Sequence, residues 1–218
     1  MKRKKVGIMG GTFDPIHVGH LILGESAYHQ FALDKVLFMP SGNPPHKRSR
    51  EGRATLIQRI EMVRLAIEGN PHFELSLDDA CEEGYSYTKQ TLERLTSMHP
   101  NTEYYFIMGA DSLFSFEEWN APERISQLAV IVAAVRDHVE PEALQRQVFY
   151  LQQKFAADIR LLSTPNMDIS SQMLRDWIQK KRSLRYYMPD KVLQYIEEHG
   201  IYQMTDSSNG EQIKEVTC

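Results

Sequence analysis

Short apolar runs alternate along the chain with longer segments in which apolar residues recur at the spacing of one helix face. The run from Val6 to Met9 ends at two glycines, and AVIVAAV at residues 129–135 is apolar at every position. Runs that are apolar throughout are typical of strands in a parallel sheet with both faces buried. The pattern predicts strands at residues 5–9, 35–40, 73–77, 103–110, 129–135 and 158–163.

The longer segments predict the helices that cover this sheet. Asp14-Pro15 reads as an N-cap followed by proline at the first helical position, so the first helix is predicted to begin there. Strands alternating with helices indicate the α/β class, a doubly wound parallel sheet with a small C-terminal helical segment. Helices are predicted at residues 15–31, 56–67, 87–99, 142–155, 168–181 and 189–200.

Composition supports a single packed domain. Of the 218 residues, 42% are hydrophobic and 25% are charged, so a core is expected and wholesale disorder is not. One domain is predicted over residues 1–203, followed by a polar, frayed tail at 204–218. Cys81 and Cys218 fit a reducing compartment. No apolar run has the length of a signal peptide or membrane span, so a cytoplasmic protein without a membrane partner is expected.

The net charge argues against a nucleic-acid partner. The chain carries −4 at pH 7 and therefore has no overall basic field to hold a phosphate backbone. The runs KRKK and HKRSR keep non-specific nucleic-acid binding as an alternative, which the net charge disfavours. An anionic ligand would have to be held by local donors.

Two predicted strands end at glycine followed by polar residues. One end is Met9-Gly10-Gly11-Thr12, and the other is Met108-Gly109-Ala110-Asp111. In open parallel sheets, ligands bind beyond the carboxyl ends of the strands where the strand order reverses. The sequence therefore predicts that these two ends are neighbours and face one crevice.

The segment GTFDPIHVGH carries the candidate chemistry. Gly10 and Gly11 are expected to let the backbone turn sharply and approach a ligand, with helix N–H groups following as an anion site. His17 and His20 are three residues apart and share a helix face, so together they could hold a polyphosphate. Zinc ligation is the alternative, but no cysteine or carboxylate-histidine cluster is nearby to complete it. The segment matches neither the dinucleotide fingerprint nor a Walker loop.

GGTFDPIHVGH resembles the signature of the nucleotidylyltransferase superfamily, whose H-x-G-H element is His17 to His20 here. The chain resembles more closely the bacterial nicotinate-nucleotide adenylyltransferases, from Val6 to about Tyr202. Further blocks of that family appear in the family's order: NPPHK, YSYTKQTL, MGADSLFSFEEW and DISSQMLR. The resemblance implies a Rossmann-like sheet and transfer of an adenylyl group from ATP to nicotinate mononucleotide. It also implies Mg²⁺ as a cofactor, carried on the ATP phosphates without a protein metal site.

The resemblance assigns roles to residues that match the family's motifs. His17 and His20 are expected to be the catalytic pair, donating hydrogen bonds to phosphate oxygens. Gln172 stands where the family usually has threonine, so no contact is carried over to that position. The expected ATP-binding residues are Gly10, Gly11, Thr12, Phe13, His17, His20, Gly109, Asp111, Ile169, Ser170, Ser171 and Arg175. Helix capping is the alternative role for Asp111 and for the two serines.

The second substrate is expected to meet a different set of residues. Lys47 is assigned to its phosphate, Thr88 and Trp119 to the pyridine ring and its carboxylate, and Arg136 to added positive charge. A core position is the alternative for Trp119. Asp137 stands where the family often has proline, which leaves the geometry of that loop open.

Other functions stay open at this point. The acceptor could be nicotinamide mononucleotide or phosphopantetheine, although the GADSLFSFEEW and YTKQT blocks favour nicotinate mononucleotide. A nucleotide-binding regulator without turnover is a second alternative, but such a protein could lack His20, Arg175 or the glycines, and all are present. Both a monomer and a homo-oligomer are compatible with the sequence.

Overall fold

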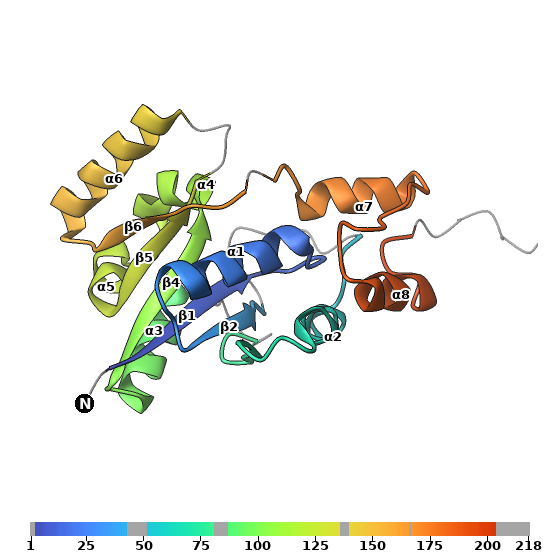
Figure 1. Ribbon diagram of the computed structural model, residues 1–218, viewed down its shortest axis with the longest axis horizontal. Helices are drawn as coiled ribbons and strands as arrows, with labels where there is room; N and C mark the ends of the chain where they lie inside the picture. The colour runs from blue at the N-terminus through green and yellow to red at the C-terminus, as the bar shows by residue number, and fades with distance from the viewer. Residues whose placement is uncertain (1–2, 43–51, 81–86, 136–139, 166, 204–218) are drawn as a thin grey trace, which may run out of the picture.

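A computed structural model describes residues 3–42, 52–80, 87–135, 140–165 and 167–203 (Figure 1). Among these residues, six parallel strands form one sheet in the order β3-β2-β1-β4-β5-β6. Because β1 lies between β2 and β4, the chain winds outward to one edge and then returns to wind toward the other. The strands are β1 (Lys4–Gly11), β2 (Lys35–Pro40), β3 (Phe73–Leu75), β4 (Thr102–Gly109), β5 (Ala129–Ala134) and β6 (Ile159–Leu162).

Helices cover both faces of the sheet. The first face carries α1 (Val18–Gln30) and α2 (Leu56–Ile67). The second carries α3 (Thr88–Met98), α4 (Ala110–Phe114), the 3₁₀ turn η1 (Phe116–Glu118), α5 (Pro122–Leu128) and α6 (Pro141–Phe155). Alternate strand residues enter the two cores: in β5, Val130 and Val132 pack on the first side, and Ile131 on the second. This burial on both sides explains why the strand is apolar at every position.

Two further helices, α7 (Ser171–Gln179) and α8 (Asp190–Glu198), extend the first face beyond the carboxyl ends of the strands (Figure 1). Helix α8 packs against α2, and Leu174 of α7 joins the same core. The segment between α7 and α8 reaches the start of α1, where the Val18 N–H donates to the Tyr187 carbonyl (2.9 Å). The C-terminal helices therefore close over the turn that joins β1 to α1.

The predicted fold class is confirmed, and so are the six strands. Helix α1, however, begins at Val18 rather than at Asp14-Pro15. The cap interpretation was wrong because the Asp14 carboxylate turns into the protein, where it accepts hydrogen bonds from the Ala54 N–H (3.1 Å) and the Tyr202 hydroxyl (2.7 Å). It is therefore not placed to cap the first turn of α1.

The segment between β4 and β5 folds into α4, η1 and α5, which the sequence pattern did not predict. Ala110, predicted as the end of a strand, is the first residue of α4. Helices of three to seven residues contain too few turns to establish an apolar period, so burial decides them. Among the described helices, none combines the length and apolar character needed to cross a bilayer.

Candidate active site

The candidate site is a cleft at the point where the winding of the sheet reverses. Strands β1 and β4 are direct neighbours, with Met9 opposite Ile107, so the two glycine-ended strands lie side by side as predicted. A cavity of about 670 Å³ opens there, within the size range of small-molecule sites. Its lining includes Gly10, Gly11, Thr12, Met39, Ser41, Asp79, Tyr87, Thr88, Thr91, Phe106, Ser112 and Trp119.

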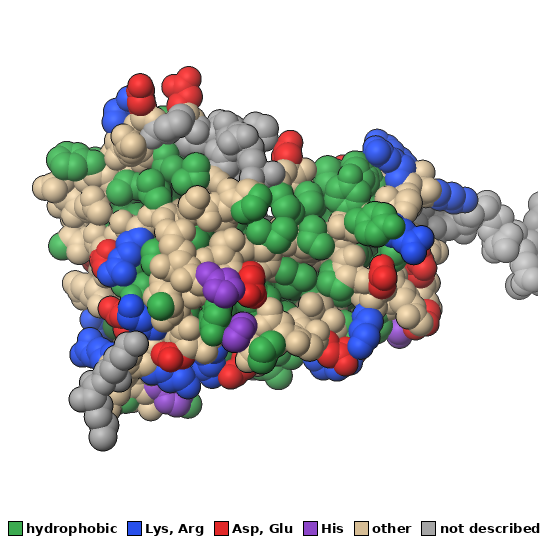
Figure 2. Space-filling model, in the orientation of Figure 1, with side chains coloured by type: hydrophobic (Ala, Val, Ile, Leu, Met, Phe, Trp, Pro, Cys, Tyr) green, Lys and Arg blue, Asp and Glu red, His purple; other side chains and the backbone are tan. Residues whose placement is uncertain are grey.

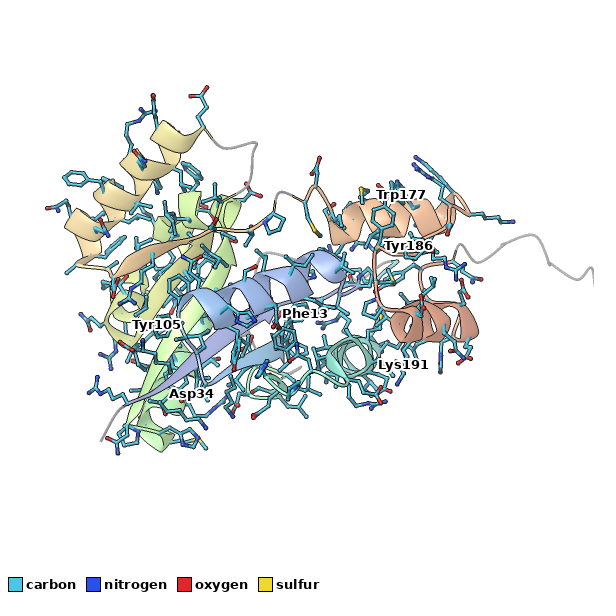
Figure 3. The ribbon with its side chains drawn as sticks, viewed as in Figure 1. Phe13, Asp34, Tyr105, Trp177, Tyr186 and Lys191 are labelled. Atoms are coloured by element: carbon cyan, nitrogen blue, oxygen red, sulfur yellow. The ribbon has the colours of Figure 1, made fainter. Side chains whose placement is uncertain are left out.

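The glycines act differently from the prediction. Strand β1 continues through Gly11, and neither Gly10 nor Gly11 has a positive φ. The left-handed position is Phe13, with φ of 49°. The chain therefore turns after the glycines. Because glycine has no side chain, Gly10 and Gly11 leave the backbone open to a ligand along the cleft. The Phe13 side chain is buried beneath α1 (Figure 3), packed on Phe38, so only its backbone is available to a nucleotide.

His17 and His20 form a close pair at the start of α1. His17 is the N-cap residue and is 3% exposed, and the two ring centroids are 3.8 Å apart. The His17 N–H donates to Nδ1 of His20 (3.3 Å). Because Nδ1 accepts this bond, a neutral His20 ring carries its proton on Nε2, which becomes a hydrogen-bond donor. The edge of the Phe13 ring also meets His20, at a centroid distance of 5.1 Å.

The helix start itself offers less to an anion than the sequence suggested. The Val18 N–H is bonded to Tyr187, and the His20 N–H donates to the His17 carbonyl (3.0 Å). Two donors of the first turn are thus used within the protein. The imidazoles, rather than a row of helix N–H groups, are the donors that this element can direct at phosphate.

Gly19 is required by the packing of the His17 ring. A Cβ placed on Gly19 would lie 2.9 Å from Nδ1 and 3.0 Å from Cε1 of that ring. We expect Gly19→Ala to displace the His17 ring and to lower kcat for the expected adenylyl transfer about tenfold, while the protein stays folded. Steady-state kinetics alongside circular dichroism would measure this. A normal kcat in the alanine variant would contradict the prediction.

Helix α7 brings the predicted second group beside this turn. Ser170 is the N-cap, with its hydroxyl accepting from the Met173 N–H, and the Ser171 hydroxyl donates to the Pro15 carbonyl (2.9 Å). The Arg175 guanidinium donates to the Asp14 carbonyl and to Gln172. Ser170 therefore caps α7, and Ser171 attaches the helix to the turn. Gln172 accepts a hydrogen bond from Arg175 and so helps to hold the guanidinium in place.

A small apolar hollow separates α1 from the segment before α7. Ile169, assigned to ATP by resemblance, lines it with Gly19, Ile22, Leu23 and Met167. Figure 2 shows apolar side chains gathered over the facing parts of α1 and α7. The structure thus brings Ile169 next to the segment from Phe13 to His20, the histidine turn, although these residues are about 150 positions apart in the chain.

Asp14 joins this turn to the C-terminal end of the chain. Its carboxylate is 2% exposed and lies 3.8 Å from the Arg175 guanidinium in addition to its bonds to Ala54 and Tyr202. Burial and the neighbouring carboxylate raise the pKa of the Tyr202 hydroxyl, which keeps it a donor. The sequence did not indicate this role, because Asp-Pro is also a common helix-start signal.

The other wall of the cleft carries two of the residues predicted for the second substrate, Thr88 and Trp119. Thr88 is the first residue of α3, and Trp119 follows η1. Trp119 is partly buried, with centroid distances of 5.9 Å to Phe106 and 5.6 Å to Phe116, so it is fixed on one side and faces the cleft on the other. Asp111 is exposed on α4, whose N-cap is Gly109, so it does not cap that helix.

Asp79 lines the cleft, although the sequence did not mark it as a site residue. Its Oδ1 accepts from the Thr91 hydroxyl (3.0 Å), and its carbonyl accepts from the Gly42 N–H (2.8 Å). Burial raises the pKa of this carboxyl above its usual value, and the Thr91 bond offsets only part of the effect. Its position soon after β3, at the carboxyl edge of the sheet, could have indicated from the sequence that it lies in the cleft.

The raised pKa of Asp79 predicts how stability depends on pH. A carboxylate with a raised folded-state pKa destabilises the fold above that pKa, and acidification toward its usual pKa removes the penalty. Asp79→Asn keeps the acceptor for Thr91, so we expect it to be more stable than wild type at neutral pH, with the gap closing as pH falls.

Urea unfolding, repeated from neutral pH down to the usual pKa of an aspartate, measures the difference in unfolding free energy between Asp79→Asn and wild type. Asp78→Asn is the control, since it removes a carboxylate paired with Arg94 (3.5 Å) and should give no such gain. A gap between Asp79→Asn and wild type that stays constant with pH would refute the assignment.

Lys47, Arg136 and Asp137 lie outside the described residues. Among the residues that are described, no group of three or more histidine, cysteine or acidic side chains could hold a metal ion.

Comparison with known proteins identifies the family. A family model described as cytidylyltransferase-like matches residues 8–176. A protein of Lachnoclostridium phytofermentans named "Probable nicotinate-nucleotide adenylyltransferase" is 45% identical over 202 residues, which are 91% of this chain and 99% of that protein. The chain belongs to the nicotinate-nucleotide adenylyltransferase family. A family member of the same name from Desulfitobacterium hafniense is 38% identical, over 92% of this chain and 97% of its own length.

Solved structures of the family confirm the fold. The Plasmodium falciparum nicotinic acid mononucleotide adenylyltransferase complexed with NaAD aligns with a TM-score of 0.74, covering 91% of this chain and 97% of that one, at 19% identity. The same enzyme complexed with APC gives a TM-score of 0.73. The two chains therefore share one fold at low sequence identity.

Proposed function

We propose that this chain transfers the adenylyl group of ATP to the phosphate of nicotinate mononucleotide, forming deamido-NAD and releasing pyrophosphate. One observation carries the proposal beyond family membership. The residues that lead into the histidine turn (Gly10, Gly11 and Thr12) and the wall formed by Thr88 and Trp119 line one cleft, where β1 and β4 are adjacent. A nucleotide held by the turn would therefore lie next to an aromatic ring held by the wall.

The chemistry needs alignment and charge neutralisation rather than a protein nucleophile. A phosphate oxygen of the mononucleotide attacks the α-phosphorus of ATP, and the bond from that phosphorus to the oxygen bridging to the β-phosphate breaks. Pyrophosphate leaves with that electron pair. Because the attacking group is already an anion, no strong base is required. Nε2–H of His20, set by the bond from the His17 backbone, is the donor to the transferring group.

The cleft wall suits a nicotinate ring. The indole of Trp119 offers a face for stacking, and the N-terminus of α3 begins at Thr88. A helix N-terminus favours a carboxylate over a neutral amide because its backbone N–H groups carry partial positive charge. This is the physical reason for choosing nicotinate over nicotinamide mononucleotide.

Magnesium is proposed to enter with ATP. It would be bound by the phosphate oxygens, as is usual for an ion that keeps several of its waters, and would neutralise phosphate charge. The residues proposed for the phosphates are His17, His20 and Arg175, with Lys47 for the acceptor phosphate by resemblance.

Purified chain, ATP and acceptor, with pyrophosphate release as the readout, test the proposal. We expect kcat/KM for nicotinate mononucleotide to exceed that for nicotinamide mononucleotide. A preference for the amide, or for phosphopantetheine, would replace the proposed substrate. No turnover with any acceptor, together with measurable ATP binding, would favour a nucleotide-binding regulator.

A further inference from the structure

Arg59 is a buried cation that the proposed mechanism does not use. It lies in the second turn of α2 and is 7% exposed. Its Nη1 donates to the carbonyls of Thr12 (2.7 Å) and Ser41 (2.7 Å), and its Nη2 donates to the carbonyl of Gly42 (3.2 Å). One planar guanidinium thus holds three backbone carbonyls from two separate segments.

These two segments form neighbouring parts of the cleft. Thr12 follows β1 and leads into the histidine turn, whereas Ser41 and Gly42 follow β2. Thr12 and Ser41 both line the cleft. The Ser41 N–H also bonds to the Gly11 carbonyl (2.8 Å), so the sheet pairing continues to the point where Arg59 binds.

The connection continues to the opposite wall. Gly42, held by Arg59 through its carbonyl, donates its N–H to the Asp79 carbonyl (2.8 Å). Asp79 in turn accepts from Thr91 of α3, the helix that begins at Thr88. A continuous path of hydrogen bonds therefore links two parts of the cleft. One is the turn between β1 and α1, the proposed ATP turn, and the other is the wall formed by Thr88 and Trp119, the proposed mononucleotide wall. Arg59 is the central member of this path.

We infer that Arg59 is a positioning residue that fixes the ATP turn relative to the mononucleotide wall. The inference rests on the proposed function, since the two substrates are those named there. In-line transfer depends on the distance and angle between the attacking oxygen and phosphorus, and small misplacements reduce the rate strongly. Arginine suits the task because its rigid fork fixes several acceptors at once, which a lysine ammonium does less well.

Arg59→Met tests this inference because it keeps the aliphatic length and removes every donor. We expect kcat to fall by about 10²-fold, while KM for ATP and for nicotinate mononucleotide each change by only a few-fold. Arg59→Lys should retain part of the rate. Arg64→Met is the matched control on the same helix, because Arg64 is exposed and pairs with Glu61 one turn away (2.6 Å), and it should behave as wild type.

Chemical rescue separates positioning from general stability. In Arg59→Ala, added guanidinium at non-denaturing concentration should restore part of kcat, whereas the same concentration of ammonium should not. If Arg59→Met fails to fold, the Lys variant and the rescue experiment provide the same test. Circular dichroism and ATP-binding stoichiometry correct kcat for the folded fraction.

The possible failures are distinguishable. An active wild type with a folded Arg59→Met whose corrected kcat is within about twofold of wild type would overturn the inference and leave the proposed function intact. Higher KM values with normal kcat would assign Arg59 to binding and would also overturn it. A wild type that forms no deamido-NAD would overturn the proposed function and this inference with it.

Discussion

Replacing His20 with alanine is expected to lower kcat for adenylyl transfer by about 10²-fold or more. The proposed donor is Nε2–H, and two contacts fix it: the bond from the His17 N–H to Nδ1 and the close packing of the two rings. Alanine removes the donor from a site where negative charge spreads over the transferring group. KM for ATP should change less than kcat, since the bond is strongest in the transition state.

The measurement is steady-state pyrophosphate release with saturating substrates. His29→Ala is the control, because His29 lies in the last turn of the same helix and its exposed ring pairs with Glu25 of that helix (3.0 Å). It should keep the wild-type rate. His20→Asn, which restores a neutral N–H donor on a shorter side chain, should recover part of the loss. A folded His20→Ala variant with unchanged kcat would rule out the assigned role.

Replacing Asp14 with alanine is expected to lower the free energy of unfolding by about 3–5 kcal/mol. The substitution removes the acceptor for the Tyr202 hydroxyl and the Ala54 N–H, and it takes away a carboxylate 3.8 Å from Arg175. These groups are buried or nearly so, and losing their partner costs far more than the same loss at the surface. Activity should fall too, because the histidine turn and α7 meet at this residue.

Urea unfolding measures the loss of stability. Tyr202→Phe removes only the hydroxyl and should cost about 1 kcal/mol. Asp34→Ala is the matched control, because the Asp34 carboxylate also accepts from a backbone N–H, that of Lys5 (2.7 Å), but in an exposed position. If Asp14→Ala and Asp34→Ala destabilise the protein equally, the structural role of Asp14 is wrong.

Several features followed from sequence because local rules decide them. The apolar runs predicted the parallel sheet, since a strand buried on both faces must be apolar at every position. The glycine-ended strands predicted the place of the cleft, because parallel strands present their carboxyl ends at one edge. The H-x-G-H spacing placed His17 and His20 together, although His17 is the N-cap rather than a helical residue, because the third side chain of a helix can reach back to the N-cap.

Other features depended on contacts between distant segments. Asp14-Pro15 carries the same local signal whether the carboxylate caps a helix or enters the core. Tyr202, which is 188 positions away and supplies a buried donor, decides between the two. Arg59 reads in the sequence as one more polar residue of an amphipathic helix, and only the meeting of β1 and β2 beneath α2 gives it three carbonyls to bind.

The sequence alone therefore determined the class of fold, the edge of the sheet that carries the candidate site, and the histidine pair. Each depends on spacing along one element, which sequence records directly. The tertiary structure decided which polar side chains connect the elements: Asp14 to the C-terminal end, Arg59 to two strand ends, and Asp79 to the cleft wall. Burial makes such bonds selective, because a buried donor or acceptor must be satisfied by whichever distant group folding brings to it.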